Sequence, residues 1–152
     1  MDKTDCTRQE EGPAEGGEPF SIASEDAYVV SANARCWRCR AVIEVVCIYC
    51  ATGEILGDRY EGFAVSNITA VDAALWRQLE RWPSFRFGYS HSAQGRYLAN
   101  HCPSCRALQG DYFLHCEPAG AFFALKGAAP GAIALTPLLG QVRLSGDEGF
   151  EP

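Results

Sequence analysis

Two pairs of cysteines share one spacing and are the residues of this sequence best suited to chemistry. Cys36 and Cys39 lie in C-W-R-C, and Cys102 and Cys105 lie in C-P-S-C. A C-x-x-C turn between two strands presents two thiolates to one ion, and two such knuckles complete a tetrahedron with Zn–S distances of about 2.3 Å. The spacing predicts that the four cysteines bind one structural Zn²⁺ ion, with reduced core thiols or a disulfide as the alternatives.

The chain between the two pairs is long, so the cost of bringing them together has to be weighed. The intervening segment, 40–101, has 62 residues, and closing such a loop costs about 4 kcal/mol. Structural zinc contributes on the order of 10–16 kcal/mol, which outweighs this cost. Four arginines flank the pairs and would offset the negative charge of a zinc tetrathiolate: Arg35, Arg38, Arg40 and Arg106.

A third C-x-x-C, formed by Cys47 and Cys50, raises the question of a second metal site with His115 and Cys116. Positions three apart on a regular strand point to opposite faces, so Cys47 and Cys50 can share an ion only if the strand breaks there. We interpret these two as buried core thiols. Whether the four residues form a second site stays open at this point.

An enzymatic interpretation would rest on the H-C-E sequence of residues 115–117, which matches the H-x-E of zinc deaminases. Deaminases place H-x-E before their C-x-x-C pair, whereas here it follows Cys102 and Cys105. A four-cysteine site also leaves no open position for an activated water. We therefore predict a non-catalytic protein, with a zinc-dependent or thiol-redox enzyme as the less favoured alternative.

The elements around the cysteines read as strands, with one helix among them. Residues 41–50 are rich in β-branched side chains and predict a buried strand that leaves the first pair. Residues 69–82 place Leu75, Leu79 and Trp82 on one stripe and predict the main helix, ended by Pro83. Further strands are expected over 59–65, 84–90, 96–100 and 111–117, with an edge strand over 141–145. The fold class is therefore α+β and β-rich, an antiparallel sheet with one main helix (about 69–82) inserted between the two cysteine knuckles.

Charge separates the ends of the chain from its middle. Residues 1–30 hold eight acidic residues against Lys3 and Arg8, and their surplus equals the net charge of −6 of the whole chain. We expect an acidic disordered tail over 1–25, a zinc-containing domain over 26–143 and a second disordered tail over 144–152. The polar N-terminus is unlike a secretory signal, and no apolar stretch is long enough to cross a bilayer. We expect a cytoplasmic protein.

Two classes of partner fit this composition. A protein partner is expected first, because Trp and Arg are enriched in interface hot spots. Nucleic acid is the alternative, bound by stacking on aromatic rings and by arginines on phosphates. The expected contact surface consists of Trp37, Arg35, Arg38, Arg40, Arg106 and Tyr97.

The two cysteine motifs resemble a family of bacterial zinc-ribbon proteins. In that family a C-W-x-C knuckle is completed by N-x-C-P-x-C-G-x-x-Q-G-[DN]-[FY]-F, and this chain has C-W-R-C followed by N-H-C-P-S-C-R-A-L-Q-G-D-Y-F. The resemblance covers roughly residues 30–125. It implies a β-rich zinc-ribbon-like fold with the four cysteines as ligands, and no particular activity. Glycine commonly follows each knuckle in the family, whereas this chain has Arg40 and Arg106, which cost about 1 kcal/mol each if their φ angles are positive.

Overall fold

Long antiparallel strands make up most of the protein. The computed structural model describes residues 20–116, 120–122 and 134–149. All strand pairings in this part are antiparallel. One short helix, α1 (Ala73–Gln78), runs into the 3-10 turn η3 (Leu79–Arg81), and a π-helical turn, η4 (Tyr112–Cys116), follows β6. The strands are β1 (Ile22–Arg35), β2 (Val42–Ile55), β3 (Asp58–Val71), β4 (Phe85–Ser90), β5 (Gly95–His101), β6 (Leu108–Gln109), β7 (Ala134–Pro137) and β8 (Val142–Gly149).

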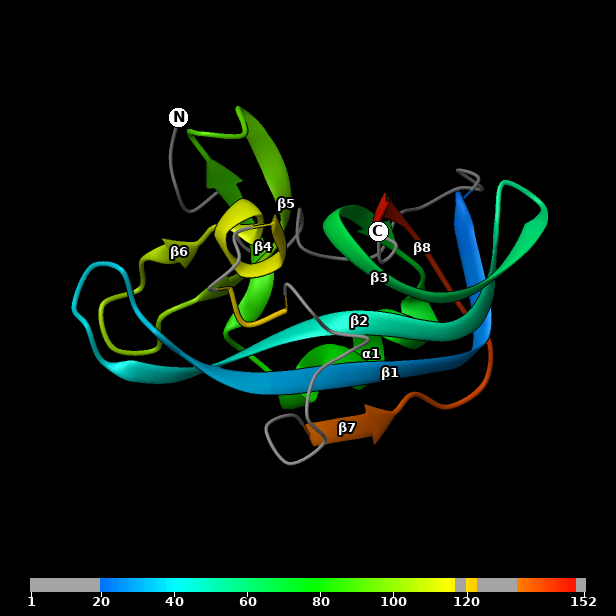
Figure 1. Cartoon of the computed structure of the whole chain (residues 1–152), viewed down its shortest axis with the longest axis horizontal. Coiled ribbons are helices and arrows are strands. Elements are labelled where there is room, and N and C mark those ends of the chain that lie inside the picture. The colour runs from blue at the N-terminus through cyan, green and yellow to red at the C-terminus, as the bar shows by residue number, and fades with distance from the viewer. Residues whose placement is uncertain (1–19, 117–119, 123–133, 150–152) are drawn as a thin grey trace.

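Four of the strands close into a barrel (Figure 1). β1 pairs with β2, β2 with β3, β3 with β8, and β8 pairs back with β1. The predicted edge strand over 141–145 is therefore wrong in its position. Val142 and Leu144 are fully buried, so this strand gains more by lying between β1 and β3 than it would at an edge.

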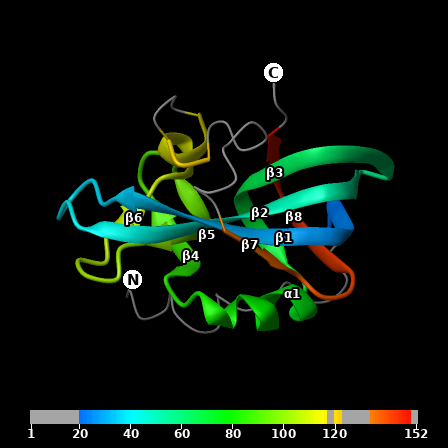
Figure 2. The ribbon, with the colours of Figure 1, turned by 60° about the horizontal axis from the view of Figure 1, so that its bottom comes forward.

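The barrel strands and the helix share one apolar core. Ile48 and Phe63 from β2 and β3 contribute to this core together with Leu144 of β8, and all three are inaccessible to solvent. Leu75 and Leu79 pack into the same core from α1 and η3. Figure 2 shows α1 lying along one side of the strands. Each such side chain stabilises the fold by about 1.5–3 kcal/mol when it is fully buried.

The helix is shorter than the predicted segment 69–82. β3 continues to Val71, which is fully buried and pairs with β8. Asp72 is the N-cap of α1, and its carboxylate accepts a hydrogen bond from the Leu75 N–H at 2.9 Å. The apolar stripe is therefore correct for the helix itself, while pairing with β8 decides the conformation of the residues before Asp72.

The end of the β1–β2 hairpin that carries its turn extends beyond the barrel as a two-stranded ribbon. The β1–β2 ladder reaches the Arg35–Val42 pair, whereas the β2–β3 ladder begins only at Ile48. Where the ribbon leaves the barrel, the Asn100 side chain accepts from the Val46 N–H at 2.8 Å and donates to the Val46 carbonyl at 2.9 Å. The ribbon is thereby held against β5.

A second, smaller sheet contains β4, β5 and β6. β3 joins it to the barrel, because Ile68 of β3 pairs with Leu98 of β5. β5 ends at His101, directly before the second cysteine pair, and β6 pairs back onto Asn100 and His101. The second pair therefore occupies the turn between β5 and β6.

The expected domain limits at 26 and 143 fall inside strands. β1 begins at Ile22, β8 ends at Gly149, and both Ile22 and Leu144 are fully buried. Residues 22–25 and 144–149 thus belong to the fold, not to tails. Residues 1–19 and 150–152 of the two expected tails lie outside the described residues.

The predicted strand over 111–117 is also wrong for residues 111–116, whereas residue 117 lies outside the described part of the chain. The N–H groups of Phe113 and Leu114 both donate to the Gly110 carbonyl, at 3.1 and 3.2 Å, which starts a turn instead of a ladder. The turn is η4. Among the described residues, no helix combines the length and the apolar character needed to cross a bilayer.

Candidate metal centre

The two cysteine pairs meet in space, although 62 residues separate them in the sequence. The Sγ atoms of Cys36, Cys39, Cys102 and Cys105 all lie within 4.8 Å of one another. The Sγ atoms of Cys36 and Cys105 are 3.7 Å apart, and those of Cys39 and Cys102 are 3.6 Å apart. The β1–β2 turn and the β5–β6 turn that carry them lie side by side in Figures 1 and 2. The predicted convergence of the two pairs is confirmed, and four sulfurs in this arrangement could hold a metal ion.

The two turns have the same backbone hydrogen bonds. In the first, the Cys36 N–H donates to the Ala41 carbonyl at 2.8 Å, and the Cys36 carbonyl accepts from the Arg40 N–H at 3.0 Å. The second repeats both bonds between Cys102 and Ala107, at 2.9 Å, and between Arg106 and Cys102, at 2.8 Å. Both turns are therefore knuckles of one local fold, which we call the first and second knuckle.

Arg40 and Arg106 both have φ angles of 70°. This is the left-handed region, which an L-residue with a Cβ adopts at a cost and which glycine adopts freely. The backbone strain expected from the missing glycines is therefore present in both knuckles.

Backbone N–H groups point at one sulfur in each knuckle. The N–H groups of Arg38 and Cys39 lie 3.3 and 3.5 Å from the Cys36 sulfur. In the second knuckle the N–H groups of Ser104 and Cys105 lie 3.3 and 3.4 Å from the Cys102 sulfur. Donors in these positions stabilise a thiolate, which is the form that binds a metal.

The pKa values of the thiols follow this pattern. Burial opposes ionisation of Cys36, but the knuckle N–H groups and the side chain of Gln109 outweigh it and lower the pKa of this thiol to about 6. Hydrogen bonds from its own knuckle also lower the pKa of Cys102. A backbone hydrogen bond acts in the same direction on Cys39, but burial and the neighbouring sulfurs outweigh it and raise its pKa to about 11. A divalent cation would remove this repulsion between adjacent sulfurs.

Two side chains connect the knuckles to each other. Gln109 is buried, and its amide donates to the Cys36 sulfur at 3.4 Å and to the Ala107 carbonyl at 2.9 Å. The Trp37 indole N–H donates to the Leu108 carbonyl at 2.8 Å. The sequence analysis assigned no role to Gln109, although it is the glutamine of the quoted motif, four positions after Cys105.

One of the predicted contact residues is not at the surface. Tyr97 is only 4% exposed, and its hydroxyl accepts a hydrogen bond from the Asp111 N–H at 2.9 Å. The prediction is wrong because β5 is covered on both faces from Tyr97 to His101. The other predicted contact residues, Trp37, Arg35, Arg38, Arg40 and Arg106, are exposed.

Cys47 and Cys50 do not face a common site. Cys50 packs in the barrel core, whereas Cys47 packs in a second apolar cluster under the knuckles, so they point to opposite faces of β2 as predicted. Burial raises the pKa of both thiols, that of Cys50 to about 11. His115 is half-buried, and its ring centroid lies 5.3 Å from that of Phe122. Among the residues that the structure describes, the four knuckle cysteines are the one group of His, Cys, Asp or Glu side chains close enough to hold a metal ion.

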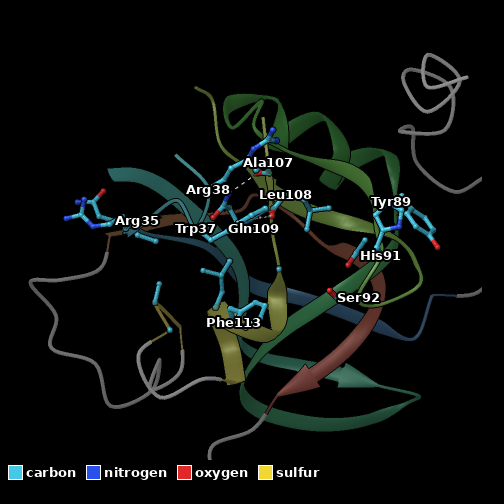
Figure 3. Close-up of a pocket in the computed structure, with 17 residues that line it drawn as sticks. Arg35, Trp37, Arg38, Tyr89, His91, Ser92, Ala107, Leu108, Gln109 and Phe113 are labelled. Carbon is cyan, nitrogen blue, oxygen red and sulfur yellow. Dashed lines mark hydrogen bonds between the residues drawn. The ribbon is translucent and has the colours of Figure 1, made fainter. Parts of the chain in front are cut away.

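A groove of about 860 Å³ lies beside the first knuckle (Figure 3). Its walls include Trp37 and Arg38 of the knuckle, Arg35 at the end of β1, Tyr89 of β4 and Phe113 of η4. We call it the aromatic groove. The sequence does not single out Tyr89 or Phe113 as surface residues, because its pattern predicts a half-buried strand over 84–90 and a further strand over 111–117.

The fold and the centre together define a class: a β-rich protein with a closed four-stranded barrel and a cluster of four cysteines compatible with a metal ion. The chain matches no protein-family model, and neither a curated protein nor a solved structure is significantly similar to it.

Proposed function

We propose that the four knuckle cysteines bind one structural Zn²⁺ ion. The observation that carries this proposal is the approach of their sulfurs to within 4.8 Å of one another. A tetrahedral ion with Zn–S distances of about 2.3 Å separates its sulfurs by about 3.8 Å. The Cys39–Cys102 and Cys36–Cys105 sulfur separations, 3.6 and 3.7 Å, are close to this value. The paired knuckles also support a relationship to the zinc-ribbon family that the sequence resembles.

The ion has a structural role in this proposal. Four thiolates fill the four positions of tetrahedral zinc, so none is open for a reacting water. The ion would instead join the end of the β1–β2 ribbon to the β5–β6 turn, two segments that barrel packing alone leaves at the edge of the fold. Metal-binding energy is then part of the folding energy.

The test uses the full-length protein purified without added metal. We expect one zinc per chain, and, after exchange, a Co²⁺ spectrum of tetrahedral all-thiolate coordination. Cys102→Ser should lower the melting temperature by more than about 10 °C, because several kcal/mol of metal-binding energy are lost. Cys116→Ser is the matched control, since Cys116 is an exposed thiol outside the cluster.

Three outcomes would oppose the proposal. The first is a chain that holds no metal when it is folded. The second is a Co²⁺ spectrum with water or nitrogen ligands. The third is a Cys102→Ser variant as stable as Cys116→Ser.

We also propose that the zinc-stabilised module is non-catalytic and acts by binding a partner at the face of the first knuckle. Support comes from Trp37, which is 62% exposed and yet held in place by its hydrogen bond to Leu108. A protein partner remains one candidate, because Trp and Arg are enriched in hot spots. A stable protein interface, however, needs about 800 Å² on each partner, whereas the exposed rings here gather in a concave groove. This observation favours a smaller or thinner ligand.

A further inference from the structure

The walls of the aromatic groove carry three exposed rings from three different elements. Trp37 in the first knuckle is 62% exposed, Phe113 in η4 is 61% exposed, and Tyr89 in β4 is 51% exposed. A fourth ring, that of His91, meets the Tyr89 ring edge to face at 5.0 Å between centroids. Figure 3 shows Tyr89 and His91 at one end of the groove and Arg35 at the other. Large apolar rings exposed in one groove mark a binding site.

The ring of Trp37 is fixed before any ligand arrives. Its one polar atom, Nε1, already donates to the Leu108 carbonyl at 2.8 Å. What the side chain offers to a ligand is therefore the face of the indole. Because this hydrogen bond joins the first knuckle to β6, which directly follows the second knuckle, the position of the ring depends on the two knuckles being held together.

Charge selects among the ligands that such rings accept. The chain has 19 acidic residues, but none of the described residues that line the groove is Asp or Glu, whereas Arg35 and Arg38 both line it. The Arg35 guanidinium donates to the Arg40 carbonyl at 2.9 Å, which holds its charge at the rim. A ligand with flat apolar groups and regularly placed negative charges complements this surface.

We propose that the aromatic groove binds single-stranded nucleic acid, with bases stacked on Trp37 and Phe113 and phosphates paired with Arg35 and Arg38. Base stacking on aromatic side chains combined with a cationic groove is the usual way in which proteins hold single strands. A cavity of about 860 Å³ has the size that takes ligands of nucleotide dimensions. An acidic peptide would satisfy the arginines but would leave the rings without flat partners.

This inference rests on the proposed structural zinc, because the ion holds the knuckles that position Trp37 and Leu108. The assay is fluorescence anisotropy with the full-length, metal-loaded chain and labelled single-stranded DNA and RNA oligonucleotides. Two phosphate contacts predict a slope of about −1.4 in log K against log salt, so affinity should fall about sevenfold between about 50 and 200 mM salt. Arg38→Gln should halve that slope. Phe113→Ala should weaken binding about tenfold through the lost stacking, and its exposed position makes it compatible with folding.

Arg59→Gln is the matched control for charge, because Arg59 is exposed at the β2–β3 hairpin and does not line the groove. It should leave binding unchanged. Two competitors test the kind of ligand. A mononucleotide with the base of the labelled oligonucleotide should displace that oligonucleotide poorly. Polyglutamate should also displace it poorly, because it has no flat groups to stack on the aromatic rings.

Several results would overturn the inference. The groove does not bind single strands if the anisotropy stays flat up to on the order of 100 µM protein at about 50 mM salt, which is the weak limit of the usual range of non-specific binding. Equal loss in Arg59→Gln and Arg38→Gln, or no loss in Phe113→Ala, would place binding elsewhere. Displacement by the mononucleotide at the same nucleotide concentration would assign the groove to free nucleotides, and equal binding of polyglutamate would assign it to acidic protein segments.

Metal content is measured on the same sample, so that the two proposals can fail separately. A chain with one zinc and no oligonucleotide binding refutes the groove proposal alone, whereas a metal-free folded chain refutes the zinc proposal.

Discussion

Replacing Arg40 or Arg106 with glycine should stabilise this protein, although both residues are arginines beside a cluster of thiolates. Each has a φ angle of 70°, a conformation that is strained for every residue with a Cβ. Each also closes its knuckle by donating its N–H to the carbonyl of the first cysteine, a contact that glycine keeps. The substitution therefore removes strain without removing the backbone hydrogen bond.

The magnitude follows from two opposing terms. The left-handed conformation costs an L-residue about 1–2 kcal/mol, while glycine loses about 0.5–1 kcal/mol more backbone entropy on folding. The net gain is about 1 kcal/mol for each substitution, which corresponds to a rise of about 2–4 °C in melting temperature for a chain of this size. The double variant should gain about twice as much, less any coupling through the shared ion.

The assay is thermal unfolding of Arg40→Gly, Arg106→Gly and the double variant at one fixed zinc concentration. Arg40→Ala and Arg106→Ala are the matched controls, because alanine removes the same charge and keeps the strain. Each glycine variant should be more stable than its alanine counterpart. If the alanine variants are equal to or more stable than the glycine variants, the knuckles do not have positive φ angles at these positions, and the reasoning is refuted.

Three further expectations concern side chains that join separate elements. Asn100→Ala should lower the free energy of unfolding by about 2–4 kcal/mol, because it leaves the buried N–H and carbonyl of Val46 without partners. Urea denaturation measures this free energy, and a loss below about 1 kcal/mol would contradict the expectation. Gln109→Leu should weaken zinc binding about 10- to 100-fold, as loss of a hydrogen bond to a ligand usually does. Competition with a chelator measures the zinc affinity. Unchanged affinity would show that the contact of Gln109 with the Cys36 sulfur has no effect on metal binding. Burial raises the pKa of Asp111 from its ordinary 3.8 to about 7, so the folded state retains a proton that the unfolded state releases, and the contribution of this group to stability falls as pH rises from about 4 to 7. Asp111→Asn should therefore gain stability relative to the parent chain between pH 5 and pH 8 in urea unfolding, and a constant difference across that range would contradict the assignment.

The sequence predictions were accurate where neighbouring residues decide the structure and wrong where a contact with a distant segment decides it. The strand that leaves the first knuckle could be recognised because its β-branched run is a local property, and the opposite faces of Cys47 and Cys50 follow from strand geometry alone. Val71 has the spacing of a helix residue but lies in β3, because its pairing with β8 is a contact with a segment more than 70 residues away. Such a contact leaves no trace in the local periodicity.

The turn at η4 was missed for a related reason. The alternation of Asp111, Phe113 and His115 with other residues is typical of a strand, yet the N–H groups of Phe113 and Leu114 bond back to Gly110. The carboxylate of Asp111 meanwhile accepts from the Asn67 N–H of β3 at 2.8 Å. A contact with a distant backbone group therefore competes with the local preference.

The sequence by itself determined which atoms are available for a metal and how each knuckle turns, because ligand type, C-x-x-C spacing and the residues inside a turn act over a few positions. Only the tertiary structure decided that β8 closes the barrel, that Tyr97 is buried and that Trp37, Tyr89 and Phe113 face one groove. These outcomes depend on which distant strands pair and on which side of them a ring then lies. Whether a side chain is buried depends on the assembled core, so it cannot be deduced from one segment of the sequence.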